Sequence, residues 1–137
     1  MTYDAIFLIT SAMKTIDALS MYSKEERFKQ LVETVESIKK YASPNHLIYV
    51  IDGSIEDASE ELDKIEKLGV HVFKAYDYPN VKEYAQKGLK IFIENLCLLY
   101  FVDWFKQNPQ KSKRIYKISG RYTLTENFTH GFEHENA

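Results

Sequence analysis

One arginine directly follows a segment that the sequence predicts to be a strand. Apolar and polar residues alternate through 114–118, and the small residues Ser119 and Gly120 then lead into Arg121. Ligands of an open α/β sheet bind outside the carboxyl ends of its strands, where a guanidinium suits a phosphate or a carboxylate. Ser119 and Gly120 would let a ligand approach the backbone closely. Arg121 is therefore a candidate for anion binding, with an ion pair to a surface carboxylate as the structural alternative.

A second predicted strand ends at Asp52, Gly53 and Ser54. The Asp52 carboxylate could accept hydrogen bonds from a ribose or a base, or bind Mg²⁺ through oxygen. It could equally cap its own turn, with Gly53 and Ser54 present for backbone geometry, and both interpretations stay open. Ser54 lacks a neighbouring His-Asp arrangement for nucleophilic catalysis, so the sequence does not support a serine hydrolase.

Other residue types offer weaker candidates. Lys87 precedes Gly88 and could place its ammonium over a phosphate, although most such lysines are solvated. The histidines lack metal-ligand spacing apart from His130 and His134 near the end of the chain, so no zinc site is predicted. Cys97 lies in an apolar run, which favours a buried small hydrophobe over a catalytic thiol.

Length, composition and charge exclude several classes of protein. The 137 residues fit a single domain spanning 1–137, and 45% hydrophobic with 28% charged residues is a globular composition. A net charge of −2 gives no basic field to attract nucleic acid. Charged residues interrupt the most hydrophobic window, 88–105, which favours a buried core helix over a membrane span. With no signal-peptide pattern, a cytoplasmic location is the default expectation.

Hydrophobic periodicity predicts alternating strands and helices. Strands are expected at 5–10, 47–51, 70–73 and 115–119, the last after a basic loop at 111–114. Helices are expected to follow three capping pairs, namely Ser23 with Glu26, Asp57 with Glu60, and Asn80 with Glu83. Gly69 is expected to close the second helix in a left-handed conformation.

The third helical stretch is expected to break at Gly88 and to end near 108–109, and no element is predicted for 129–137. This alternation predicts an α/β fold, a Rossmann-like and mostly parallel sheet with helices on both faces. No Gly-x-Gly-x-x-Gly or Walker loop follows the first strand, which argues against dinucleotide and ATP binding.

Three segments together resemble a known group of proteins. Residues 22–28 (Tyr-Ser-Lys-Glu-Glu-Arg-Phe), 51–54 (Ile-Asp-Gly-Ser) and 116–122 (Tyr-Lys-Ile-Ser-Gly-Arg-Tyr) resemble GT-A type glycosyltransferase-like proteins of bacteria and phages, which are linked to surface polysaccharide synthesis. The resemblance implies that a Rossmann-like half binds a nucleotide sugar, which is transferred to a hydroxyl of a saccharide acceptor. It places Thr10 and Ser11 beside the nucleotide, Asp52 near the base or ribose, and Lys87 and Arg121 near the diphosphate.

Two departures from the family pattern leave alternatives open. The metal-binding Asp-x-Asp motif, which would hold Mg²⁺ or Mn²⁺, is absent, and residues 119–121 take its expected place. A metal-independent site with Arg121 replacing the cation is one consequence, and loss of catalysis is the other. The sequence stops soon after the fourth predicted strand, so only the nucleotide-binding half is expected, and no catalytic residue is identified. The hypotheses are thus a glycosyltransferase or a non-catalytic nucleotide-sugar-binding or interaction module, either as a monomer or as a homo-oligomer.

Overall fold

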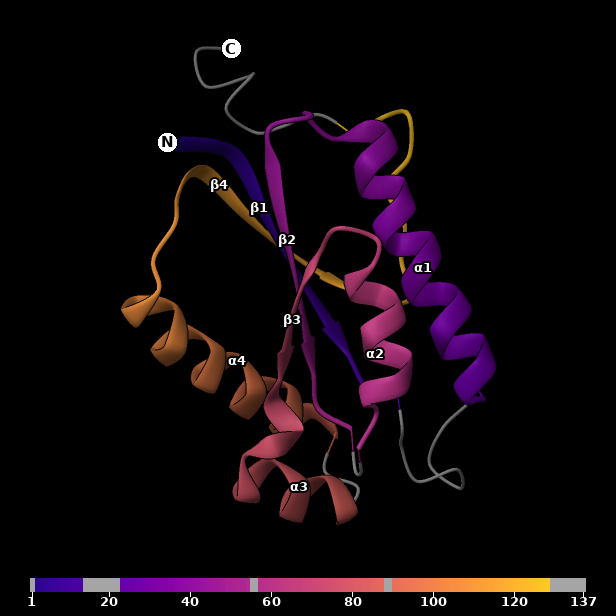
Figure 1. The fold of residues 1–137 in the computed structure, drawn as a ribbon, viewed down its shortest axis with the longest axis vertical. Helices are drawn as coiled ribbons and strands as arrows, with labels where there is room; N and C mark the ends of the chain where they lie inside the picture. The colour runs from indigo at the N-terminus through magenta and orange to yellow at the C-terminus, as the bar shows by residue number, and fades with distance from the viewer. Residues whose placement is uncertain (1, 14–22, 55–56, 88–89, 129–137) are drawn as a thin grey trace.

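The computed structural model describes residues 2–13, 23–54, 57–87 and 90–128. Within them, four strands form one all-parallel sheet in the order β3-β2-β1-β4. Helices cover both faces, with α1 and α2 on one side and α3 and α4 on the other (Figure 1). The predicted α/β, Rossmann-like architecture is therefore confirmed. The elements are β1 (Thr2–Ser11), α1 (Lys24–Tyr41), β2 (His46–Asp52), α2 (Ser59–Glu66), β3 (His71–Lys74), the 3₁₀ helix η2 (Ala75–Asp77), α3 (Pro79–Gln86), α4 (Lys90–Gln107) and β4 (Lys111–Ser119).

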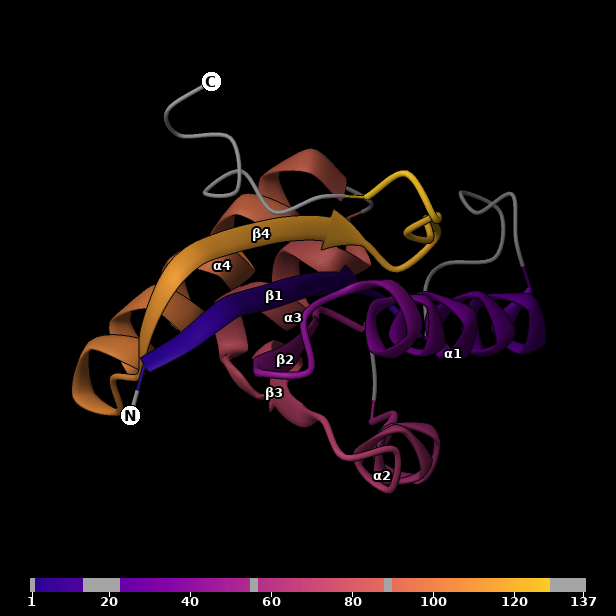
Figure 2. The same ribbon diagram turned by 90° about the horizontal axis from the view of Figure 1, so that it is seen from above.

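The continuous apolar run of β1 supplies both halves of the core. Because side chains alternate along a strand, Phe7 and Ile9 pack toward α1, whereas Ile6 packs toward α4. All three side chains are almost fully buried, and each such burial is worth roughly 1.5–3 kcal/mol. Seen from above, β1 runs between β4 and β2, in the interior of the sheet (Figure 2). The sequence pattern of a strand covered on both faces is therefore confirmed.

The first two helices show one correct and one wrong capping prediction. Ser23 Oγ accepts a hydrogen bond from the Glu26 amide at 3.1 Å, and the Glu26 carboxylate accepts one from the Ser23 amide, which completes the predicted capping box of α1. Asp57 is not the N-cap of α2, because that position is Ala58. The Asp57 carboxylate instead accepts from the amide of Ser59, two residues later, at 2.8 Å. Gly69 has φ 88°, as predicted.

The predicted third helical stretch is two helices, α3 and α4, on either side of a short segment outside the described residues that contains Gly88. Since α3 begins at Pro79, the prediction that Asn80 precedes the helix is wrong, and its side chain donates to the Tyr100 hydroxyl at 3.3 Å. The core-helix prediction for α4 holds on one face only, because Cys97 is buried while Leu99 is 67% exposed. No described helix is both long enough and apolar enough to span a membrane.

The prediction of a basic loop at 111–114 is wrong. Strand β4 begins at Lys111, which pairs with Thr2 of β1. Strand β4 is an edge strand with one uncovered face, so every second side chain is exposed, including those of Lys111 and Lys113. Because the strand begins with charged residues, its start does not show the apolar run by which strands are predicted. The segment 129–137, for which the sequence predicts no element, lies outside the described residues, as do His130 and His134.

Candidate functional site

The strand order defines where a ligand site is expected. After β1 the chain builds outward through β2 to β3, and it then returns to place β4 on the other side of β1. The carboxyl ends of β1 and β4 therefore form the topological switch point of the sheet, where open α/β folds bind ligands. Figure 1 shows these two strands running side by side along the sheet. Thr10 and Ser119 pair at this end, and they bring the predicted site residues of both strands together.

Gly120 ties the two strand ends to one another. Its amide donates to the Thr10 carbonyl at 2.9 Å, which extends the pairing of β1 with β4 by one residue. A Cβ at this position would lie 3.2 Å from the same carbonyl oxygen and 3.3 Å from Cδ1 of Leu31. The residue before it, Ser119, accepts from the Tyr122 amide at 3.0 Å and so closes the turn that carries Arg121. A small residue is needed here for close backbone packing.

Arg121 and Arg27 place two guanidinium groups at the switch point. Arg121 is exposed, and its Cζ lies 5.9 Å from the centre of the Tyr122 ring. Arg27, in the first turn of α1, is half-buried and donates from Nη1 to the Ala12 carbonyl just beyond β1, at 3.2 Å. Burial lowers the pKa of Arg27, the nearby charge of Arg121 lowers it further, and Asp52 opposes both effects. The charge of Arg121 thus acts on Arg27, and an anion bound at this end of the sheet would offset that effect.

Sequence reasoning missed Arg27, although a signal existed. In this type of fold, the helix that follows the first strand begins at the carboxyl end of the sheet. Polar residues in the first turn of α1 are therefore placed near the switch point, and Arg27 is the fourth residue of that helix. In the sequence, segment 22–28 shows a capping box and a family resemblance, and neither of them singles out Arg27.

Asp52 is enclosed rather than offered to a ligand. Its side chain is fully buried and accepts hydrogen bonds from Ser11 Oγ at 3.2 Å, the Met13 amide at 3.0 Å and Ser54 Oγ. Burial raises the pKa of the Asp52 carboxyl, and the hydrogen bonds from Ser54, Met13 and Ser11 oppose that shift. This arrangement favours the structural alternative, in which Asp52 fixes the loops after β1 and β2.

Gly53 and Ser54 belong to the same structural unit. The Gly53 amide donates to the Ser11 carbonyl at 2.9 Å, which joins the ends of β1 and β2. A Cβ on Gly53 would lie 2.8 Å from Sγ of Cys97 on α4, so the glycine lets that helix pack closely against the strand end. Ser54 is fully buried, like Asp52. Gly53 and Ser54 thus pack in the interior next to the strand ends, while Thr10 and Ser11 are only partly buried.

Glu94 forms a polar cluster with Thr10 and Lys117 on the side of the sheet that faces α4. Its carboxylate accepts from Thr10 Oγ1 at 3.2 Å and lies 2.6 Å from Lys117 Nζ. The charge of Lys117 is therefore balanced within the chain, unlike that of Arg121, which has no ion pair with any described residue. In the sequence, Glu94 is one of the charged residues that interrupt the hydrophobic window 88–105, and that position alone does not indicate a polar cluster.

Lys87 lies just after α3, and its described contacts are local. It pairs with Glu83 one helical turn earlier at 3.4 Å, and its ammonium lies 5.5 Å from the centre of the Tyr84 ring. No described contact joins it to the two arginines. Among the described residues, no group of three His, Cys, Asp or Glu side chains could hold a metal ion. The switch point therefore offers guanidinium groups, hydroxyls and backbone groups for binding.

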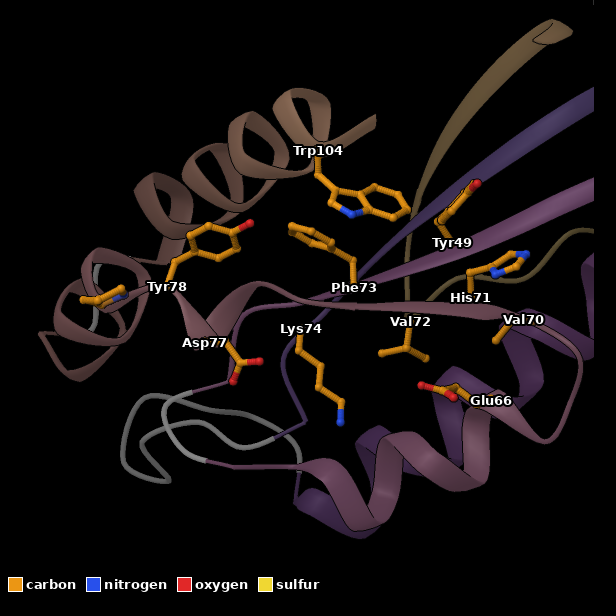
Figure 3. A pocket seen from close by; sticks show the side chains of 11 residues that line it. Tyr49, Glu66, Val70, His71, Val72, Phe73, Lys74, Asp77, Tyr78 and Trp104 are labelled. Atoms are coloured by element: carbon orange, nitrogen blue, oxygen red, sulfur yellow. The ribbon is translucent and has the colours of Figure 1, made fainter. Parts of the chain in front are cut away.

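The described cavity lies elsewhere. It has a volume of about 640 Å³ and follows β3, at the opposite edge of the sheet from β4 (Figure 3).

Comparisons of the chain with protein-family models, curated proteins and solved structures gave no match. The interpretation of both places therefore rests on their own geometry.

Proposed function

We propose that this protein binds a nucleotide-diphosphate sugar at the switch point formed by β1 and β4, and that it transfers the sugar to an acceptor hydroxyl. The observation that carries the proposal is the pair of guanidinium groups of Arg27 and Arg121, close enough for one charge to act on the other. The charge of Arg121 opposes that of Arg27, and a diphosphate presents several oxygens that suit two arginines.

The main electrostatic requirement of this reaction is stabilisation of the leaving group. The acceptor oxygen forms a bond to the anomeric carbon, the bond from that carbon to the diphosphate breaks, and the acceptor proton passes to a base. The departing diphosphate gains negative charge in the transition state, and prepositioned cations stabilise it. In this proposal Arg27 and Arg121 take the place that Mg²⁺ or Mn²⁺ has in metal-dependent GT-A glycosyltransferases. Thr10 and Ser11 are the last two residues of β1, directly before Ala12, whose carbonyl accepts from Arg27.

A second candidate function is a non-catalytic nucleotide-sugar-binding module. Two carboxylates described near the ends of β1 and β2 are both engaged within the protein. Asp52 is fully buried, and Glu94 is bonded to Thr10 and Lys117. Neither is arranged to accept a proton from an acceptor hydroxyl in this state, which favours binding without turnover.

Isothermal titration calorimetry with UDP-, GDP-, CMP- and dTDP-sugars, with and without Mn²⁺ or Mg²⁺, tests the binding step. We expect one donor class to bind, and Arg121→Ala to weaken it by roughly 10- to 100-fold through the loss of a charge-assisted hydrogen bond. Lys106→Ala is the matched control, because it removes an exposed cation from the last turn of α4 and should leave affinity unchanged. Absence of binding by folded wild-type protein would refute the proposal.

Turnover separates the two candidate functions. If a donor binds, release of the free nucleoside diphosphate, or of CMP from a CMP-sugar, can be followed by phosphorus NMR in the presence of saccharide acceptors. Release that depends on Arg121 supports the transferase, since the cations then act on the leaving group. Tight binding without release under any of these conditions supports the non-catalytic module.

A further inference from the structure

The cavity along β3 is a groove that runs the length of the strand. Strand β3 bonds to β2 on one side and ends the sheet on the other, so alternate backbone groups of His71–Lys74 point outward along its free edge. The cavity of about 640 Å³ follows that edge and is lined from both faces of the sheet. Figure 3 shows β3 crossing the view, with aromatic side chains on one side and α2 on the other.

The two walls of the groove differ because side chains alternate along β3. Phe73 pairs with Ile51 and faces α4, where its ring lies 5.6 Å from that of Trp104. Val72 and Lys74 face α2, and the Lys74 ammonium donates to Ser59 Oγ at 3.1 Å. One wall is therefore aromatic, and the other is aliphatic with charged ends.

The charges on the α2 wall lie at opposite ends of the strand. Glu66, the last residue of α2, lines the groove near its amino end, and Lys74 and Asp77 line it at its carboxyl end (Figure 3). The Lys74 ammonium also lies 4.0 Å from the Asp63 carboxylate of its own chain. A two-fold axis perpendicular to the sheet, next to the free edge, would pair β3 with a second β3 in antiparallel fashion. The same operation brings Glu66 of each copy to the end where the other copy presents Lys74, so these two side chains can form an ion pair twice across the axis.

The other free edge of the sheet, formed by β4, carries charges of one sign only. Strand β4 carries Lys111, Lys113, Arg114 and Lys117 and no carboxylate. Antiparallel pairing of two such strands would place like charges opposite one another, which is destabilising. Charge thus selects β3 over β4 as the edge at which two copies of this chain can meet.

We propose that two copies of this protein associate through antiparallel pairing of β3, which joins their sheets into one and buries the groove. The aromatic wall with Trp104 and Phe73 is covered, and the ends are held by reciprocal pairs between Glu66 and Lys74. Because β3 has only four residues, the dimer is weak and reversible, with a dissociation constant of about 1–100 µM. This proposal does not depend on the ligand of the switch point.

Sedimentation velocity over a wide concentration range tests the dimer, with Glu66→Lys and Lys74→Glu as single charge reversals. Each places like charges in both symmetric pairs, and we expect the dissociation constant to rise about tenfold or more. The double variant Glu66→Lys/Lys74→Glu restores opposite charges and should return to within about threefold of wild type. Lys111→Glu, on β4, is the matched control and should leave the dimer unchanged.

Trp104 supplies a second measurement, because it is the only tryptophan of the chain and lines the groove. Its fluorescence should shift to shorter wavelength as the wild-type concentration rises, and should not shift for Glu66→Lys. Lys74 has contacts to Ser59 and Asp63 within its own chain, so Lys74→Glu can impair folding. Glu66 has no ion pair with a described residue. If Lys74→Glu does not fold, Glu66→Lys therefore tests the dimer by itself. A wild type that stays monomeric up to about 1 mM, or a dimer that Glu66→Lys leaves intact, overturns the proposal.

Discussion

Sγ of Cys97 lies 2.8 Å from the position that a Cβ on Gly53 would occupy. This contact joins the middle of α4 to the loop that follows β2, next to the buried Asp52 carboxylate. Nothing in the local sequence of either residue indicates it, since they are separated by 44 positions in the chain. The glycine is thus explained by packing, and it keeps the helix close behind the switch point.

Substitution of Gly53 by alanine should destabilise the protein by about 1–3 kcal/mol, because the new methyl group overpacks the contact with α4. Urea denaturation of the wild type and of Gly53→Ala measures the cost. Cys97→Ala removes the sulfur, so Gly53→Ala should cost less in that background than alone. Strictly additive costs would show that Cys97 is not what restricts position 53.

Asp52→Asn should destabilise the fold by about 1–3 kcal/mol, because the new amide group faces donors from Ser54. The loss should depend on pH. Burial holds the folded-state pKa of Asp52 above its unfolded value of about 3.9, so the native state binds more protons between these two values. Stability from this group is therefore largest at low pH and falls as pH rises through the folded pKa.

The stability difference between wild type and Asp52→Asn isolates this titration, because all other groups are shared. Chemical denaturation at a series of pH values from about 3 upward should show the difference shrinking as pH rises from about 4 and then levelling off. A difference that grows with pH would mean that the hydrogen bonds from Ser11, Met13 and Ser54 outweigh the effect of burial.

Without a bound anion, Arg121→Gln should be as stable as wild type or more stable at low ionic strength. The substitution removes a positive charge that acts on the half-buried Arg27 and breaks no described ion pair. Added sodium chloride should reduce the difference, since the screening length is only about 10 Å at 0.1 M salt. Thermal unfolding of both proteins checks this, with Lys106→Gln as the control. A clear loss of stability in Arg121→Gln would contradict the repulsion.

Cys97 should be inert in the folded protein. Burial raises the pKa of its thiol to about 12, and the charges of Asp52 and Glu94 add to that effect. Because the thiolate is the reactive form, a disulfide reagent at neutral pH should label Cys97 only on unfolding, and labelling should track the urea transition. Rapid labelling without denaturant would mean that α4 separates from the sheet in the native state.

The sequence alone determined the elements that depend on local patterns. The apolar runs of β1 and β2 predict strands covered on both faces, Ser23 with Glu26 predicts the start of α1, and Gly69 predicts a left-handed residue. These features depend on side-chain alternation, capping and backbone sterics within a few residues. The start of β4 could not be found this way, because an edge strand with one uncovered face carries lysines where a central strand is apolar.

Only the tertiary structure decided which residues meet at the site. Strand order brings Gly120 against Thr10, the fold brings Arg27 of α1 near Arg121, and α4 brings Glu94 to Lys117. It also encloses the Asp52 carboxylate, which is fully buried and hydrogen-bonded to Ser11 and Met13. These contacts join residues far apart in the chain, and they follow from strand pairing and helix packing, which local periodicity does not encode.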